Sequence, residues 1–225
     1  MNKGGIIIDK IVPKFKDSLI LNTSDVLQDY AEIGIDSFFD NDIVKNIPVV
    51  KTIVSAKKVF DNLTDRNLLK NLVIFINELN SGVIDREKLA RHKKKLEDSK
   101  KAEKELGMFL IILNQTFNNE KSILYGKIYK AYINQKINWD NVVEFSEIVS
   151  RMFIQDLSIL KDLYLKKPFI VSNYTPNRLN TFRIERLYSL GIVGYSPKAL
   201  FPGGGTESYV NLNELGKIFT ETIFE

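Results

Sequence analysis

The sequence predicts a mainly α-helical protein, an irregular helical bundle that is followed by a small α/β tail with a β-hairpin. Apolar residues recur at helical spacing through most of residues 21–167, and no segment in that range alternates apolar and polar residues as a strand does. After Pro168 the pattern changes to short β-branched runs and turn-rich segments such as "FIVS" and "NYTPN". We therefore expect an N-terminal arm at 1–20, a helical bundle at 21–167 and a tail domain at 168–225.

Six or seven helices are expected before residue 168. Two of them should begin at side chains that can accept hydrogen bonds from the first backbone N–H groups of a helix, Asp85 and Asn138. Asp98 or Ser99 either starts a further helix or lies within the helix that begins at Asp85. The segment "KELGMFLIILNQTF" is apolar almost all round, which predicts the central buried helix. The other expected helices span about 24–39, 49–60, 64–79 and 118–135, with a long final helix that runs from Asn138 to about Lys167.

The tail is predicted to contain a helix that stops at Gly191, two short strands, "IVGYS" and "ESYVNL", and a closing helix. Three glycines, Gly203 to Gly205, lie between the two strands. A phosphate-binding P-loop requires a lysine after its last glycine and a helix directly after the loop, whereas Thr206 and Glu207 lead here into a strand. The glycines are therefore expected to form the tip of a β-hairpin.

The tail resembles the second half of a winged-helix domain. The resemblance rests on a Leu-x-x-Leu-Gly-hydrophobic pattern before the hairpin and on a polar entry to the last helix. The matching residues are Leu187, Leu190, Gly191 and Ile192, followed by Leu212, Glu214, Leu215 and Gly216. The segment "PFIVSNYTPN" is short where the second helix of a helix-turn-helix belongs, so protein interaction and a structural use of the module stay open beside DNA binding.

The resemblance implies that the helix from about Asn177 would read duplex DNA. Three of the seven arginines of the chain lie in this helix, and arginine makes planar bidentate contacts with guanine or phosphate that lysine cannot make. Glu185 and Glu207 oppose phosphate binding, and the predicted hairpin loop carries no basic residue beyond Phe201. The predicted contact residues for nucleic acid or a partner are Arg178, Asn180, Thr181, Arg183 and Arg186.

Positive charge is concentrated in residues 86–105, which we name the basic segment. It holds nine Lys or Arg and five acids, an excess of four that equals the net charge of the whole chain. Such a run is most often the solvated side of a helix, and otherwise a contact for nucleic acid or an anionic membrane surface. The residues singled out in it are Arg91, Lys93, Lys94, Lys95, Lys100 and Lys101.

The residue types of common catalytic chemistry are scarce. The chain has no cysteine and a single histidine, His92, which is expected to be solvated because it lies between Arg91 and Lys93. Common zinc sites and cysteine or serine triads therefore cannot be assembled. We expect no catalytic, cofactor-binding or metal-binding residues, and no small-molecule substrate is evident. The lack of cysteines, of a signal peptide and of a long apolar run favours the cytoplasm.

The helical region resembles a group of uncharacterised bacterial helical proteins of mobile elements, through segments such as "LLKNLVIFINEL" and "EKELGMFLIILNQ". A helical region followed by a winged tail is also similar to the Abi-alpha family, which is linked to abortive phage infection. The resemblance implies a cytosolic accessory or antiviral defence role. Three hypotheses follow: a non-enzymatic interaction protein that binds a protein partner or itself, a winged-helix regulator that binds duplex DNA, and a peripheral effector that inserts residues 43–60 into an anionic membrane.

Overall fold

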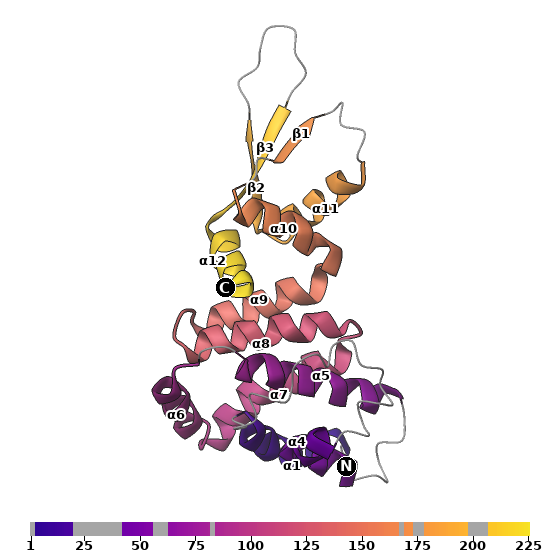
Figure 1. Cartoon of the computed structure of the whole chain (residues 1–225), viewed down its shortest axis with the longest axis vertical. Helices are drawn as coiled ribbons and strands as arrows, with labels where there is room; N and C mark the ends of the chain where they lie inside the picture. The colour runs from indigo at the N-terminus through magenta and orange to yellow at the C-terminus, as the bar shows by residue number, and fades with distance from the viewer. Residues whose placement is uncertain are drawn as a thin grey trace, which may run out of the picture. The chain divides into compact units, whose positions relative to one another are not determined.

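The structure is a computed structural model that describes residues 3–19, 42–55, 63–81, 84–166, 169–172, 178–197 and 207–225 (Figure 1). These residues form eleven α-helices and three β-strands, which confirms the mainly helical fold class and the hairpin near the C-terminus. The chain divides into two compact units, Met1–Val142 (unit 1) and Val143–Glu225 (unit 2). The boundary between the two units lies within a helix. It comes earlier in the chain than the domain boundary that the sequence predicts after residue 167.

Unit 1 is built from helices whose starts largely match the predicted capping residues. Asp85 accepts hydrogen bonds from the backbone N–H groups of Glu87 and Lys88, and Asp98 accepts one from Lys100. The prediction of a helix start at Asp85 is therefore confirmed, and Asp98 starts a further helix, while the helix expected at about 24–39 lies outside the described residues. The helices are α1 (Lys3–Ser18), α3 (Asp42–Asn46), α4 (Pro48–Ser55), α5 (Leu63–Asn80), α6 (Arg86–Lys95), α7 (Ser99–Gln115), α8 (Asn119–Ile133) and α9 (Trp139–Arg151), which continues into unit 2.

The predicted N-terminal arm is wrong, because most of it is helix α1. Pro13 lies inside this helix, at its eleventh residue. The side chains of Ile11 and Phe15, one turn apart, are both buried, as is Leu19 directly after the helix. Burial of this apolar row against α4 and α7 outweighs the cost of the proline, which is about 3 kcal/mol in a helix interior.

The core of unit 1 is aromatic and joins four helices that are distant in sequence. The ring of Phe75 on α5 lies 5.7 Å from Phe15 on α1 and 4.9 Å from Phe109 on α7, measured between ring centroids. Phe109 lies 5.0 Å from the ring of Tyr129 on α8. All four side chains are fully or almost fully buried, so they fix the mutual packing of α1, α5, α7 and α8.

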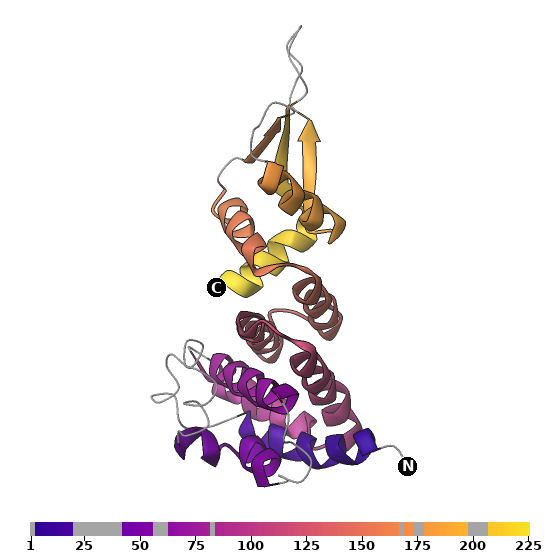
Figure 2. The same cartoon turned by 90° about the vertical axis from the view of Figure 1, so that its right-hand side faces the viewer.

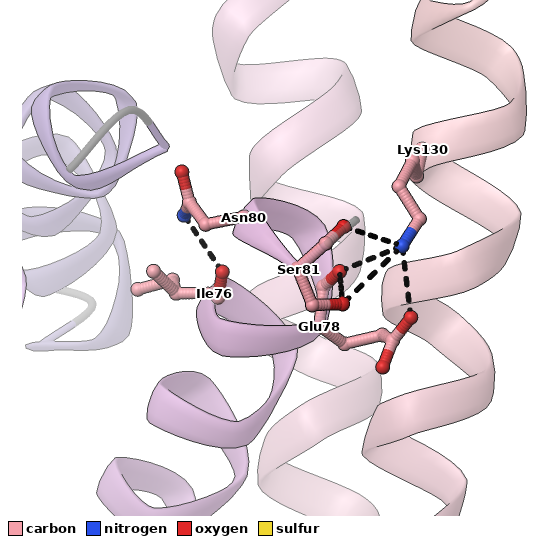
Figure 3. A network of polar contacts seen from close by, with 5 residues as sticks. All are labelled: Ile76, Glu78, Asn80, Ser81 and Lys130. Carbon is pink, nitrogen blue, oxygen red and sulfur yellow. Dashed lines mark hydrogen bonds and ion pairs between the residues drawn. The ribbon is translucent and has the colours of Figure 1, made fainter. Parts of the chain in front are cut away.

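Helices α5 and α8 approach closely at Gly126, and Figure 3 shows the polar contacts that join them beside this point, at Lys130. A Cβ atom at Gly126 would lie 2.8 Å from the Cβ of Glu78 and 3.0 Å from the carbonyl oxygen of Phe75. One turn further on, the Lys130 ammonium donates to the Glu78 carboxylate and carbonyl, each at 2.9 Å, and to the carbonyl of Ser81 at 3.0 Å. Lys130 therefore adds a donor at the C-terminal end of α5, where Ser81 also donates its hydroxyl to the Glu78 carbonyl at 2.8 Å.

Replacing Gly126 with alanine should lower the free energy of unfolding of unit 1 by about 1–3 kcal/mol, the usual cost of overpacking. The added methyl group meets backbone and an α5 side chain, so the two helices must separate. Denaturant unfolding followed by the fluorescence of Trp139, the only tryptophan, measures the change. Gly107→Ala on α7 is the matched control, because its new Cβ would have only an ordinary contact at 3.9 Å and should stabilise the helix. Equal stabilisation by both substitutions would contradict the close approach.

Unit 2 begins with the rest of α9, whose predicted continuation to Lys167 is wrong. The helix ends at Arg151, and the backbone turns at Phe153, whose N–H donates to the Asp156 carboxylate at 2.9 Å. The carboxylate thereby offers the backbone an alternative to the helical hydrogen bond. The following elements are η1 (Ile154–Asp156), α10 (Leu157–Tyr164), β1 (Phe169–Ser172), α11 (Arg178–Ser189), β2 (Val193–Pro197), β3 (Glu207–Leu212) and α12 (Glu214–Phe224).

The three strands form one antiparallel sheet in the order β1-β3-β2, and α11 packs beside β2 (Figure 2). Strands β2 and β3 pair from Val193 opposite Leu212 to Pro197 opposite Ser208, as expected for the two arms of a hairpin. The three glycines themselves lie outside the described residues, but the chain after them enters β3 at Glu207. A P-loop needs a helix in that place, so the strand argues against phosphate binding by this loop.

The helix before the hairpin ends where the sequence predicts, although it buries a different face. Gly191 has a φ of 74°, the left-handed conformation that glycine adopts at a helix C-terminus. The buried side chains of α11 include Ile184 and Leu187, whereas Phe182 is 66% exposed. The spacing of the sequence predicts that Phe182 shares one face with Leu179, Leu187 and Leu190. That prediction is wrong for Phe182, because Ile184 lies closer to the face that Leu187 defines.

Candidate functional site

The structure describes the predicted DNA-reading helix in part. The side chains of Arg178 and Asn180 lie outside what it describes, and those of Thr181 and Arg183 are partly exposed on α11. Arg186 is held within unit 2, where its Nε and Nη2 atoms donate to the two carboxylate oxygens of Asp156 at 2.7 and 2.6 Å. This bidentate contact engages the guanidinium edge that would pair with guanine.

Asp156 is completely buried, and its contact with Arg186 has a structural role. The guanidinium also lies over the ring of Phe153, with Cζ 4.2 Å from the ring centroid. The hydrogen bonds that Arg186 donates to Asp156 raise the pKa of Arg186 above its ordinary value. One carboxylate therefore joins α11 to the chain turn that ends α9, and Arg186 is part of that connection.

The net charge of the chain lies in unit 1. Residues 143–225 contain nine Lys or Arg and nine acids, so unit 2 is electrically balanced and unit 1 carries the whole excess of four. Non-specific affinity for nucleic acid comes mainly from positive side chains that contact phosphate groups. Any such attraction of a polyanion to this chain would therefore act on unit 1.

The basic segment forms α6 and the first turns of α7. The side chains of Arg91, Lys94, Lys95 and Lys100 are exposed. Those of Lys93 and Lys101 are half-buried. Burial lowers the pKa of Lys93, although the charge of Asp17 on α1 opposes the shift. Lys101 lies 3.7 Å from a buried carboxylate of α7. Four of the six singled-out cations are thus directed to solvent.

The prediction that His92 is solvated is wrong, because its side chain is buried inside unit 1. Its Nε2 atom lies 2.8 Å from the hydroxyl of Tyr129 and 3.2 Å from the carboxylate of Glu105. The hydroxyl of Tyr129 donates to Glu105 at 3.2 Å, and that of Tyr132 donates to the other carboxylate oxygen at 3.1 Å. We name these residues, His92, Glu105, Tyr129 and Tyr132, the buried polar cluster.

Donors surround the carboxylate of Glu105 on both oxygens, and this sets the acidity of the cluster. Burial alone raises the pKa of Glu105, but the hydrogen bond and charge of His92, the Lys101 ammonium and the hydroxyl of Tyr132 together bring it below its ordinary value. Burial and the neighbouring carboxylate raise the pKa of Tyr132 to about 12 and that of Tyr129 well above its ordinary value. The cluster therefore holds an ionised carboxylate between two phenols that stay protonated near pH 7.

Beside the buried polar cluster is an open cavity of about 330 Å³, which we name the basic pocket. Among the described residues that line it, four are basic and none is a carboxylate. Tyr132 and His92 also line it, so the cluster reaches the pocket wall. The pocket is lined by Lys88, Arg91, His92, Lys95, Tyr132, Ile133, Gln135, Lys136, Ile137, Asn138 and Asn141.

The start of α9 forms one side of the basic pocket. Asn141 donates its backbone N–H to the side chain of Asn138 at 2.9 Å, and the Asn141 side chain accepts from the backbone of Asn138 at 3.2 Å. This reciprocal cap confirms the helix start predicted at Asn138. The partial positive charge of a helix N-terminus adds to the potential of the four basic side chains.

Sequence reasoning missed the basic pocket because its residues come from two stretches that are distant in sequence, α6 and the segment 132–141 that joins α8 to α9. The usable signal was the position of His92 on α6, three residues after the buried Leu89. A second cavity, about 760 Å³ within unit 2, is lined by both signs of charge, including Lys166, Lys217 and Glu221. It therefore offers no comparable electrostatic preference.

Two further observations concern the described part of the chain. No group of three His, Asp or Glu side chains there is arranged to hold a metal ion, and no helix there is both long and apolar enough to cross a membrane.

Compared with protein-family models, with curated proteins and with solved structures, the chain matches none. The resemblance to winged-helix and Abi-alpha proteins stays a prediction.

Proposed function

We propose that this protein is a binding protein that recognises nucleic acid through the basic segment of unit 1. The observation that supports the proposal most is the distribution of charge. The whole net excess lies in unit 1, and the exposed cations of α6 and α7 form a cationic surface on it. A surface of this kind binds phosphate by releasing condensed counterions, without requiring a particular base sequence.

Fluorescence anisotropy with a labelled random 20-base-pair DNA duplex, titrated with salt, tests the proposal. We expect binding that weakens steeply with salt. The double substitution Lys94→Ala/Lys100→Ala, which removes two exposed charges outside the basic pocket, should weaken binding and reduce the salt slope by about 2. Lys161→Ala/Lys217→Ala in the balanced unit 2 removes the same charge and should have a smaller effect. Failure of the wild-type protein to bind at low salt would refute the proposal.

A second candidate is DNA reading by α11 of unit 2, as the winged-helix resemblance implies. Its support is the position of Arg183, which is partly exposed on the helix that directly precedes the β2–β3 hairpin. Arg183→Ala is the informative substitution, because Arg186→Ala would also break the contact with Asp156. Loss of binding in Arg183→Ala with retention in Lys94→Ala/Lys100→Ala would favour the tail over the basic segment. The antiviral defence role that the Abi-alpha resemblance implies is compatible with either candidate function and stays a prediction.

A further inference from the structure

We propose that the basic pocket binds a small phosphorylated organic molecule of about mononucleotide size. This goes beyond nucleic-acid binding by the basic segment, because the pocket is a concave site with its own lining. It would remain valid if duplex DNA failed to bind to the exposed surface.

The charge of the pocket selects an anion. Lys88, Arg91 and Lys95 follow one another at intervals of three and four residues on α6, so they project from one face of that helix. Lys136 and the N-terminus of α9 contribute positive potential from other segments. Since no carboxylate is among the described residues of the lining, a negatively charged ligand meets no opposing charge from them.

Phosphate fits this arrangement better than a carboxylate does. A phosphate monoester carries about 1.5 to 2 negative charges near pH 7 and has three strongly accepting oxygens, which match several donors placed around one centre. Arg91 can offer two parallel N–H groups to such a group, and the lysine ammonium groups can each contribute one donor. The ion pair between Arg91 and Glu87 does not prevent this, because it is 3.4 Å long and both side chains are largely exposed.

The remainder of the lining suits an organic body. Ile133 and Ile137 offer apolar surface, Tyr132 offers part of an aromatic ring, and Gln135 and Asn138 carry amide groups that both donate and accept. A volume of about 330 Å³ lies at the lower end of the range for small-molecule pockets, about 300–1,000 Å³. Inorganic phosphate alone would leave most of that space unfilled.

The buried polar cluster gives the pocket a fixed wall. Tyr132 donates to Glu105 and lies 5.4 Å from the ring of His92, so its orientation is set from behind the pocket. The amine of Lys88 is held as well, since it donates to the carbonyl of Asn134 at 2.9 Å. Because these groups are ordered by contacts within unit 1, they need less ordering when a ligand binds.

Trp139 provides a direct signal for the test. It is the only tryptophan, it follows the pocket residue Asn138, and its ring lies 5.4 Å from that of Tyr132. The intact protein is titrated with AMP, ATP, inorganic pyrophosphate and uncharged adenosine in a chloride buffer. Tryptophan fluorescence is recorded, and isothermal calorimetry gives the stoichiometry. We expect saturable one-to-one binding of AMP or ATP, weaker binding of pyrophosphate and no binding of adenosine.

Lys95→Ala should weaken nucleotide binding about tenfold, the usual loss for one charge-assisted contact. Lys94→Ala is the matched control, because Lys94 precedes Lys95 on α6, carries the same charge and does not line the pocket. Equal loss in both variants would show only general electrostatic attraction and would overturn the proposal. The absence of saturable binding by the wild-type protein at millimolar nucleotide would overturn it as well.

A phosphate monoester also occurs at the 5′ end of a nucleic acid chain. One further comparison therefore distinguishes a free nucleotide from such a chain end. A short oligonucleotide with a 5′-phosphate is compared with the same oligonucleotide carrying a 5′-hydroxyl. Tighter binding of the 5′-phosphate form that depends on Lys95 would assign the pocket to chain ends. Tight AMP binding without that preference assigns it to a free nucleotide. Loss of duplex binding in Lys94→Ala/Lys100→Ala with unchanged AMP binding would keep the two sites distinct.

Discussion

Replacing Asp156 with alanine should lower the stability of unit 2 by about 3 kcal/mol, the low end of the cost of breaking a buried ion pair. The side chain of Asp156 is fully buried and that of Arg186 is 27% exposed, so Arg186 can recover part of its hydration when its partner is removed. The substitution also removes the acceptor of the Phe153 N–H, where the chain turns after α9.

Hydrogen exchange of the intact protein, read by mass spectrometry, localises the effect. Peptides from η1, α10 and α11 should exchange about a hundredfold faster in Asp156→Ala, which corresponds to about 3 kcal/mol. Peptides from α5 and α8 in unit 1 should be unchanged and serve as the internal control. Unchanged exchange throughout unit 2 would show that this carboxylate does not hold α11.

A double-mutant cycle separates the ion pair from the turn. Arg186→Ala leaves the Asp156 carboxylate buried with the Phe153 N–H as its remaining donor among the described residues, so it should cost nearly as much as Asp156→Ala. The double substitution should cost clearly less than the sum of the two, because each single substitution already breaks the same contact. Additive costs would mean that the two side chains act independently.

Local signals in the sequence predicted the elements whose determinants are local. Asp85, Asp98 and Asn138 each cap the helix that begins at the next residue. Gly191 adopts the left-handed conformation where a helix ends. The short strand-like runs "IVGYS" and "ESYVNL" identified the two arms of the hairpin. Chemistry that operates within one turn of the chain can be read without knowing the tertiary structure.

Errors arose where a contact distant in sequence decides the conformation. The end of α9 depends on Asp156, whose partner Arg186 lies 30 residues further on. His92 is buried because two residues of other helices contact its side chain. Tyr129 lies on α8, 37 residues further on, and Glu105 lies on α7. A histidine among lysines resembles a surface residue until those partners are known, and for the same reason the basic pocket was invisible to sequence patterns.

The buried polar cluster should make unit 1 sensitive to acid. The pKa of Glu105 is lowered in the folded protein, so its contribution to stability is present above its ordinary value of 4.5 and is lost as the pH falls through the folded pKa. At neutral pH, Glu105→Ala should cost about 3 kcal/mol, because it removes the buried carboxylate that accepts hydrogen bonds from the hydroxyls of Tyr129 and Tyr132. Below the folded pKa the wild-type carboxyl is itself protonated, so the difference between the two proteins should narrow.

Urea unfolding followed by Trp139 fluorescence from pH 7 to pH 3 measures this difference directly. The matched control is Glu103→Ala, an exposed carboxylate two residues earlier on α7, which should give a small and nearly constant difference over the same pH range. A constant difference for Glu105→Ala across the titration would show that the residue contributes by packing alone. The difference in unfolding free energy from the wild type should narrow below pH 4.5 for Glu105→Ala and not for Glu103→Ala. That result would assign the effect to the ionised carboxylate beneath the basic pocket. Packing contributes equally at every pH, whereas the charge is present only above the folded pKa.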